Sequence, residues 1–366
     1  MTENSHDPEQ KERRLMPKIF RRALAAGMLV FAGMGAAIAQ ERVVFANYGG
    51  IVADFNNRYC APRLMERYGI TLQQVAISDP LGQLKVQQAT GTNLWDVFPA
   101  EGEIVITAAA NGWLEPIDWS IVDPNNQMPA AGRHRFGVAG SVYSMVLAYR
   151  TDKVPAGRTV DGWKSYWDTR NFPGPRAMRD TPLENLEFAL LADGVELKDI
   201  YTVLSTPQGI DRAFRKLDEI KSSITVFWTS GQQPAQLLAS GEVYYTNTWS
   251  GRVVQMRNEN VPVAISWNGG SLNVPFYSIP KGARNPANAM RFFNACLMDL
   301  GVQEMNARIN GYPSLLTGLA ERLPENVRAN LPTAEGNLRQ QFTFDAEFWA
   351  KNRAAIQRRW DAWRLR

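Results

Sequence analysis

A group of aromatic and charged residues follows one alternating run of the sequence. Residues 241–249, GEVYYTNTW, alternate as a strand does, and Trp249 and Arg252 come at the end of this run. A guanidinium group presents a planar fork of donors that suits a carboxylate or a phosphate. Arg252 therefore predicts a site for an anionic group. The alternative is an internal salt bridge of Arg252 with Glu184 or Glu101.

The other reactive residues do not form a recognisable catalytic set. The chain has two histidines, at positions 6 and 134, which disfavours histidine-based metal sites and triads. No G-x-S-x-G, Walker or G-x-G-x-x-G motif occurs. The sequence therefore predicts a binding protein, not an enzyme, with no cofactor and no metal. An exported hydrolase that uses Glu101 and Glu184 is the alternative.

The N-terminus has the features of a secretory signal peptide. Residues 17–22 are mostly basic, residues 23–39 are apolar and rich in small side chains, and Ala37-Ile38-Ala39 fits a cleavage site. This pattern predicts a signal peptide at residues 1–39 and a periplasmic protein. A membrane anchor fits less well, because the run is short and interrupted by glycines. No basic cluster follows, which disfavours nucleic acid as a partner.

Two cysteines, Cys60 and Cys296, lie in predicted helices of the exported chain. An oxidising compartment permits a disulfide between them. Two buried free thiols are an equally good interpretation, because the sequence does not give the distance between the residues.

Strand patterns and helical patterns alternate along the rest of the chain. The 366 residues, 45% of them hydrophobic, are enough for two domains with cores of their own. Strands are expected within residues 42–50, 70–78, 94–100, 141–150, 175–180, 223–228 and 242–249, and helices lie between them. A last amphipathic helix is expected within residues 344–366, packed on one of the domains. The alternation predicts an α/β fold whose two units enclose a cleft at the carboxyl ends of their strands.

Several segments, in their order and spacing, resemble one family over nearly all of the exported chain. They are FANYGG at 45–50, WDVFPAEGE at 95–103, VDGWKSYWD at 160–168, LLASGEVYYTNTWSGRV at 237–253 and GYPS at 311–314. The chain resembles the periplasmic solute-binding proteins of ABC importers, specifically the spermidine/putrescine-binding family. That family implies capture of a small solute, hinge closure and docking on the membrane subunits of an ABC permease. We expect a monomer.

The resemblance also implies a two-lobe periplasmic-binding-protein fold of the type II kind. Each lobe is expected to be a mixed, mainly parallel sheet flanked by helices, and crossover hinge strands join the two. Lobe 1 is predicted at residues 40–143 plus 274–316, and lobe 2 at residues 144–273 plus 317–366.

The polyamine members of the family hold ammonium groups with acids and stack the methylene chain on aromatic rings. The chain matches Tyr48, Glu184 and Trp249 of this pattern, but Thr181 replaces an aspartate and Arg252 replaces an acid. The predicted ligand-binding residues are Tyr48, Gly49, Gly50, Glu101, Thr181, Glu184, Trp228, Trp249, Arg252, Asn273 and Tyr277.

An arginine in the site would repel a polyamine, which has only positive ends. The sequence therefore predicts a small charged solute that contains an amine and also bears a carboxylate, amino-acid-like or opine-like. A true putrescine or spermidine binder remains the alternative, and it requires that an internal carboxylate neutralise Arg252.

Overall fold

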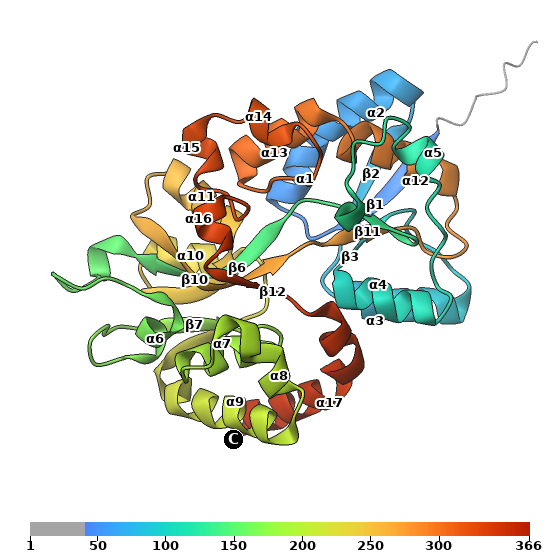
Figure 1. The fold of residues 1–366 in the computed structure, drawn as a ribbon. Helices are drawn as coiled ribbons and strands as arrows, with labels where there is room; N and C mark the ends of the chain where they lie inside the picture. Colours follow the sequence, from blue (N-terminus) through green and yellow to red (C-terminus); the bar gives the residue numbers. More distant parts are fainter. Residues whose placement is uncertain (1–40) are drawn as a thin grey trace, which may run out of the picture. The chain divides into compact units, whose positions relative to one another are not determined.

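The computed structural model of the chain describes residues 41–366 (Figure 1). The signal peptide predicted at residues 1–39 lies outside the described residues. Strands and helices alternate from the first strand onward, as the apolar patterns predict. The first elements are β1 (Arg42–Asn47), α1 (Ile51–Phe55), α2 (Ala61–Tyr68), β2 (Thr71–Ala76), α3 (Pro80–Thr90), β3 (Phe98–Ala100) and α4 (Gly102–Ala110).

Two small sheets form from the first third of the chain and one later strand. β1 and β2 pair in parallel, and Phe45 of β1 bridges to Val97 just before β3. The second sheet has the order β3-β11-β5-β4, with β11 at Phe276–Ser278, β5 at Gly137–Ala139 and β4 at Arg133–His134. All of its pairings are antiparallel. A strand from residues 276–278 therefore completes a unit that is built mainly from residues 41–139.

A six-stranded sheet, of order β12-β10-β6-β9-β7-β8, occupies the middle of the sequence. Its strands are β6 (Tyr143–Arg150), β7 (Arg176–Arg179), β8 (Ile224–Trp228), β9 (Tyr245–Trp249), β10 (Val263–Asn273) and β12 (Gln341–Thr343). β7 pairs in parallel with β8 and β9, whereas β6 pairs antiparallel with β9 and β10. The predicted sheets flanked by helices are observed, and the six-stranded one is mixed. Antiparallel pairs have a larger share than predicted, because β6 and β10 bring the chain into and out of this sheet.

Three segments cross between the small sheets and the six-stranded sheet side by side. Asn273 pairs with Tyr143, and Gly140 N–H donates to the carbonyl of Pro275 at 2.9 Å. Residues 313–314 join the same set, because Val142 N–H donates to the Pro313 carbonyl at 2.6 Å and Ser141 bridges to Ser314. These crossings lie at the wall of the cavity described below.

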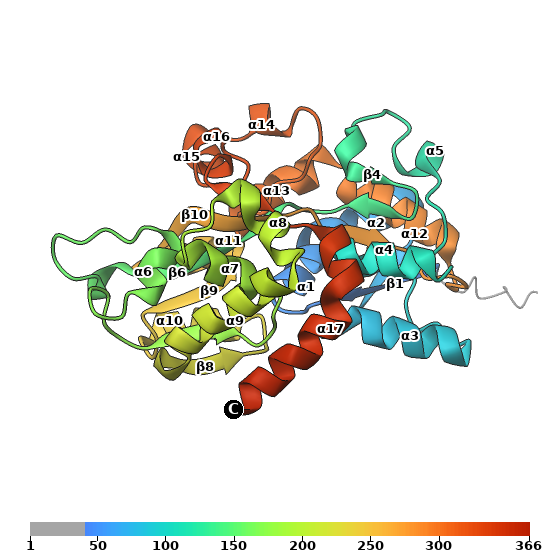
Figure 2. The same cartoon turned by 60° about the horizontal axis from the view of Figure 1, so that its bottom comes forward.

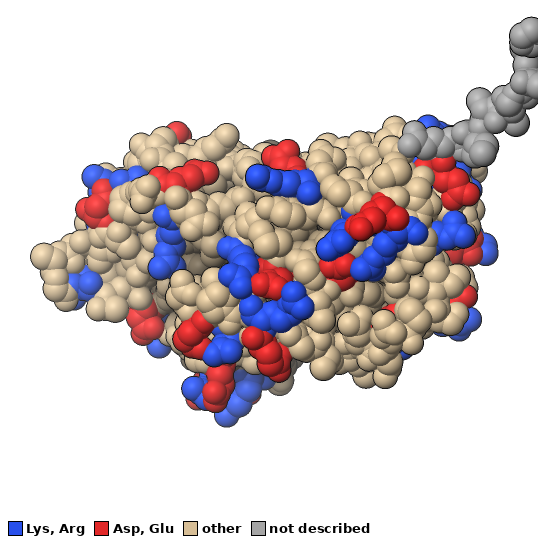
Figure 3. Space-filling view, turned by 90° about the horizontal axis from the view of Figure 1, so that it is seen from above, with Lys and Arg blue, Asp and Glu red and all other residues tan. Residues whose placement is uncertain are grey.

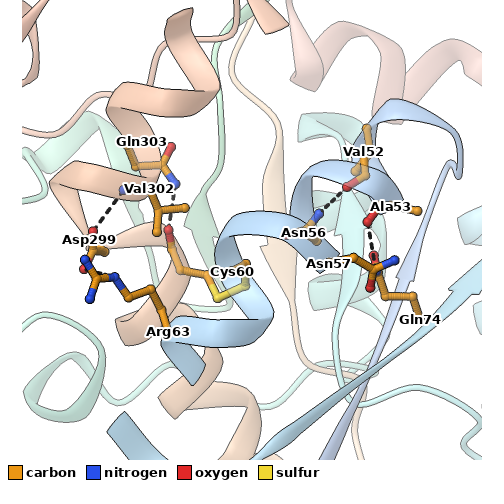
Figure 4. The surroundings of a disulfide bond; sticks show 11 residues. Val52, Ala53, Asn56, Asn57, Cys60, Arg63, Gln74, Asp299, Val302 and Gln303 are labelled. Carbon is orange, nitrogen blue, oxygen red and sulfur yellow. Dashed lines mark hydrogen bonds and ion pairs between the residues drawn. A yellow bond between two sulfur atoms is a disulfide. The ribbon is translucent and has the colours of Figure 1, made fainter. Parts of the chain in front are cut away.

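The helix predicted at residues 51–69 is observed, and a π-helical turn at Asn56–Cys60 lies between α1 and α2. A second π-helical turn, at Phe293–Leu297, contains Cys296. Cys60 and Cys296, 236 residues apart in sequence, form a disulfide with their Cα atoms 5.1 Å apart (Figure 4). The structure thus decides between the two interpretations of these cysteines in favour of the disulfide.

Two large apolar cores support the fold. One surrounds the six-stranded sheet and is rich in buried tryptophans, which are Trp163, Trp228, Trp349, Trp360 and Trp363. The other surrounds β1 and the Phe293–Leu297 turn. A smaller core lies between β3 and α4. Burial of this apolar surface is the main stabilising contribution.

The C-terminal helix α17 (Ala346–Leu365) runs from α4 to α9 (Pro207–Ile220), as Figure 2 shows. At its start, Ala346 approaches Gly102 so closely that a Cβ on Gly102 would lie 2.7 Å from the Ala346 Cβ. Towards its end, Trp363 Nε1 donates to Asp218 of α9 at 2.7 Å. The helix packs on the body of the protein, as its amphipathic pattern predicts.

No helix of residues 41–366 is both long enough and apolar enough to cross a membrane. On the face seen in Figure 3, lysine and arginine side chains alternate with acidic ones, and no broad patch of one sign appears. This agrees with the absence of a basic cluster from the sequence.

Candidate functional site

A cavity of about 550 Å³ lies where the strand ends meet the crossing segments. Its walls come from α1, from the β3–α4 junction, from the junction of β7 with α7 (Asn185–Ala192), from the β9–α11 junction and from α13 (Leu300–Asn310). The cavity falls in the size range of pockets that enclose small organic ligands. Among its lining residues the charged ones are Glu101, Arg179 and Arg252.

Arg252 lies in the first turn of α11 (Ser250–Asn258), directly after β9. Its neighbour Gly251 allows this placement, because a Cβ on Gly251 would lie 2.3 Å from both the Asn310 carbonyl oxygen and Tyr312 Cζ. The Arg252 side chain is 4% exposed, and its Nε and Nη1 atoms have no hydrogen-bond partner among residues 41–366. An unpaired buried guanidinium is costly, so its persistence favours a partner that arrives from outside the chain.

The internal salt bridge considered for Arg252 is not formed. Within residues 41–366 no carboxylate oxygen lies within 4 Å of Arg252. Glu184 instead faces Arg179, at 3.7 Å, and accepts a hydrogen bond from Asn273 Nδ2 at 2.9 Å. Burial lowers the pKa of Arg252, and the nearby Tyr312 acts in the opposite direction. An arginine nevertheless stays protonated in proteins, so the cavity contains a cation without a counter-ion.

Glu101, the residue that precedes α4, also lines the cavity. The Tyr48 hydroxyl lies 3.5 Å from Glu101 Oε1, and the Tyr48 side chain is 41% exposed. A carboxylate next to a partly exposed aromatic ring can bind an ammonium group, because the carboxylate and the face of the ring both attract a cation.

Arg179, the last residue of β7, is a lining residue that the sequence analysis missed. Its guanidinium carbon lies 5.3 Å from the centre of the Trp249 ring and 5.8 Å from that of Trp228. Arg179 lies inside the strand expected at residues 175–180, so the rule that ligands contact the residues after a strand does not select it.

The comparison with known proteins decides the family. The model of the bacterial extracellular solute-binding proteins matches residues 51–333. The chain belongs to this family. The γ-aminobutyric acid-binding protein of Pseudomonas aeruginosa is 34% identical over 340 residues, which cover 92% of this chain and 95% of that protein.

Solved structures agree with this assignment. The binding protein MotA of A. tumefaciens B6, in complex with glucopine, has a TM-score of 0.82 and 28% identity and covers 88% of this chain and 99% of its own. A sequence relative agrees as well: the spermidine/putrescine-binding periplasmic protein of Escherichia coli is 23% identical over 82% of this chain and 85% of its own length. The resemblance to that family and the periplasmic-binding-protein fold are therefore confirmed. This solute-binding protein is the substrate-binding component of an ABC transporter.

Five of the predicted ligand-binding residues line the cavity of this solute-binding protein. They are Tyr48, Glu101, Trp249, Arg252 and Tyr277. Tyr48 and Glu101 directly follow β1 and β3, Trp249 is the last residue of β9, and Tyr277 lies within β11. The two charged residues come from different elements, Arg252 from α11 and Glu101 from the residue before α4.

The other six predicted residues do not line the cavity. Gly49 and Gly50 have φ values of 68° and 55° and form the turn from β1 into α1. Thr181 lies in the turn after β7, where its carbonyl accepts from Asn185 Nδ2 at 2.6 Å. Trp228 is fully buried behind Trp249, with ring centres 5.6 Å apart.

Glu184 and Asn273 form a buried pair behind the cavity wall. Glu184 has a φ of 68°, which is uncommon for a residue with a Cβ and costs free energy unless its surroundings hold it. Burial raises the pKa of Glu184 to about 7, against the opposing charge of Arg179. Asn273 holds Glu184, and Glu184 faces the guanidinium of Arg179, which lines the cavity.

A group of amides near Arg252 was also missed. Asn306 Nδ2 donates to Ser141 Oγ at 2.6 Å, and Asn310 Nδ2 donates to Asn306 Oδ1 at 2.9 Å. Gln303 Nε2 donates to the Cys296 carbonyl at 2.7 Å (Figure 4), whereas its Oε1 has no partner in the described part of the chain. These residues lie on a helix from late in the sequence, and no strand precedes them to mark them.

Proposed function

We propose that this protein captures a small solute with a carboxylate and an amine, amino-acid-like or opine-like, in the periplasm. It then delivers the solute, as a monomer, to the membrane subunits of its ABC permease. One observation supports the carboxylate above all: the buried guanidinium of Arg252 lines the cavity without a partner. A charge-assisted hydrogen bond of that kind contributes roughly 1.5–3 kcal/mol.

The charges of the cavity support the same ligand class. Two arginines and one glutamate line it, a set that attracts a carboxylate and repels a molecule with only positive ends. The γ-aminobutyric acid-binding protein and the glucopine complex, at 34% and 28% identity, are more similar to this chain in sequence than the spermidine/putrescine-binding protein, at 23%. Both γ-aminobutyric acid and glucopine carry a carboxylate. An ammonium group of the solute would bind beside Glu101, Tyr48 and Trp249.

Hinge closure would enclose the solute between two lobes. We place the lobe boundaries near residues 143, 273 and 316, next to the three crossing segments at 140–143, 273–276 and 313–314. Tyr143 and Pro275 belong to these segments and also line the cavity. Movement at the crossings would therefore change the cavity directly.

The proposal includes no covalent chemistry. A hydrolase would need two carboxylates that face one reacting bond. Glu101 lines the cavity, but Glu184 is buried behind Arg179 and is held by Asn273. The arrangement favours binding over catalysis.

Calorimetric titration with γ-aminobutyric acid, glutamate, putrescine and spermidine tests the proposal. We expect binding of a carboxylate-bearing amine, weakened roughly 30- to 5,000-fold in Arg252→Ala, as for loss of a buried charge partner. Arg257→Ala, an exposed arginine of the same helix, is the matched control and should leave affinity unchanged. Tight binding of putrescine or spermidine that Arg252→Ala leaves intact would overturn the proposal.

A further inference from the structure

We infer that Arg179 is a second anion-binding residue of the cavity, and that the solute carries an α-amino acid group, with ammonium and carboxylate on one carbon. This inference rests on the proposed function, in which Arg252 binds a carboxylate. The α-amino acid group would bind at the Trp249 end of the cavity, between Arg179 and Glu101. The carboxylate at the other end of the solute would bind Arg252.

The guanidinium of Arg179 has unused donors. Its side chain is 25% exposed, its nearest carboxylate oxygen is Glu184 Oε2 at 3.7 Å, and that distance exceeds a hydrogen bond. Within residues 41–366 the guanidinium donates no hydrogen bond, and only the backbone N–H of Arg179 does, to Asn247 Oδ1. The fork is therefore available to a ligand.

The surroundings of Arg179 fix its position without using its donors. Its plane lies near the faces of Trp249 and Trp228, at 5.3 and 5.8 Å from the ring centres. Glu184 cannot turn freely towards it, because Asn273 Nδ2 binds that carboxylate at 2.9 Å and the side chain is 4% exposed. A guanidinium group that is held in one orientation but makes no hydrogen bond is preorganised to bind a planar anion such as a carboxylate.

A carboxylate of the protein lines the same cavity. Glu101 is a lining residue together with Arg179, and the Tyr48 hydroxyl lies 3.5 Å from Glu101 Oε1. Burial acts to lower the pKa of Arg179, but the charges of Glu101 and Glu184 outweigh it and raise that pKa. The cavity lining therefore offers both a cation and an anion of the protein. The α-amino acid group has the complementary pair of charges on one carbon atom.

The surroundings of the two arginines differ in charge. Arg252 has neutral amides near it, among them Asn310, which is hydrogen-bonded to Asn306, and no carboxylate of the described chain lies within 4 Å of it. Arg179 has a carboxylate 3.7 Å away, that of Glu184. Summed over the lining residues, two arginines and one glutamate leave one positive charge. A solute with two carboxylates and one ammonium balances that charge, and a cavity of about 550 Å³ has room for it.

Glutamate and γ-aminobutyric acid test the inference as a matched pair, because they differ only in the carboxylate beside the amine. With the full chain at pH 7.5, we expect glutamate to bind about 10- to 100-fold more tightly than γ-aminobutyric acid, the effect of one charge-assisted bidentate contact. Arg179→Gln should remove that difference and leave the affinity for γ-aminobutyric acid nearly unchanged. Arg252→Gln should weaken both ligands, and the exposed Arg257→Gln neither.

Removal of Arg179 also removes the charge that faces Glu184, so folding must be checked. The double variant Arg179→Gln/Glu184→Gln leaves no unpaired carboxylate there and should show the same loss of selectivity at an unchanged melting temperature. Arg179→Lys keeps the charge without the fork, and we expect it to retain only part of the selectivity.

The outcomes separate the two proposals. Equal affinity of the wild-type protein for glutamate and γ-aminobutyric acid, with both sensitive to Arg252→Gln, overturns the inference and leaves the proposed function intact. Equal weakening of both ligands by Arg179→Gln also overturns it, because Arg179 would then only position Trp249. If neither ligand binds, alanopine, with two carboxylates around one secondary ammonium, is tested next. Failure of all three ligands would contradict the proposed function itself.

Discussion

Arg353 of the C-terminal helix donates a hydrogen bond to Glu103 of α4 at a distance of 2.9 Å. Glu103 lies two residues after Glu101 of the cavity and is 1% exposed. Burial, followed by the charge of Glu101, raises the pKa of Glu103 to about 7, and Arg353 acts against both. The pair joins the helix that begins at the cavity to the helix that covers the core of the six-stranded sheet.

We expect Arg353→Ala to lower the free energy of unfolding by about 1–3 kcal/mol at neutral pH. The substitution leaves a buried carboxylate without its counter-ion, which costs about 3–5 kcal/mol for a fully buried pair. Arg353 itself is 35% exposed, so water screens part of that effect. Lys351→Ala removes an exposed pair with Glu347 from the same helix and should change stability little. Equal effects of the two substitutions in urea denaturation would contradict this assignment.

A buried carboxyl group that does not line the cavity should make stability depend on pH. Glu187 of α7 accepts hydrogen bonds from Trp349 Nε1 at 2.7 Å and from the Tyr201 hydroxyl at 3.0 Å, and its Oε2 has no partner in the described chain. Burial raises its pKa to about 7, although both hydrogen bonds oppose the rise. The unfolded chain titrates near its ordinary value of about 4.3. The folded state therefore holds a proton that the unfolded state releases between these values, and stability falls as pH rises through that window.

Glu187→Gln should remove the part of this loss that comes from Glu187, because glutamine keeps an acceptor for Trp349 and does not ionise. The parts from Glu103 and Glu184, whose pKa values burial also raises to about 7, should remain. We expect little difference from the wild-type protein at pH 4.5 and a gain of about 2–3 kcal/mol at pH 8. Chemical denaturation across this range measures the difference, with the exposed Glu347→Gln of α17 as the control. A gain of the same size at pH 4.5 and pH 8 would show that ionisation of Glu187 is not the cause.

The disulfide should be a major source of stability. It closes a loop of 236 residues, for which the chain-entropy model gives about 5 kcal/mol, and measured values are often nearer 2–4 kcal/mol. We expect dithiothreitol to lower the melting temperature of the wild-type protein to that of the double variant Cys60→Ala/Cys296→Ala. The variant should not respond to dithiothreitol. Equal melting temperatures of the oxidised protein and the variant would contradict the prediction.

The sequence predicts the elements well and the site only in part. Apolar periodicity depends on which face of an element is buried, so β1, α3 and β9 are found close to their predicted ranges. Pairing between strands is set by contacts that periodicity does not record, hence the antiparallel neighbours of β6 were missed. The disulfide required a distance between two helices, which only the folded chain provides.

The residues of the site likewise fall into those that the sequence predicts and those that it does not. Tyr48, Glu101 and Trp249 follow strands closely, and their positions relative to the cavity follow from the topology. Arg179 was missed because it lies within a strand and not after it, and the amides of α13 have no signal in the sequence. Glu184 was selected by the resemblance, but its role is to face Arg179 from behind the wall.

The position of the Trp249 ring provides a last test of the cavity. A Cβ on Gly231 would lie 2.6 Å from Trp249 Cζ3, and Arg179 and Trp228 contact the same ring from other sides. The ring cannot move away freely, so Gly231→Ala should shift it or narrow the cavity. We expect about a tenfold loss of affinity for the bound amino compound, measured by calorimetry, because overpacking costs about 1–3 kcal/mol. Gly336→Ala, where an added Cβ meets open space, should leave affinity unchanged. Unaltered binding by Gly231→Ala would mean that Trp249 does not contact the solute.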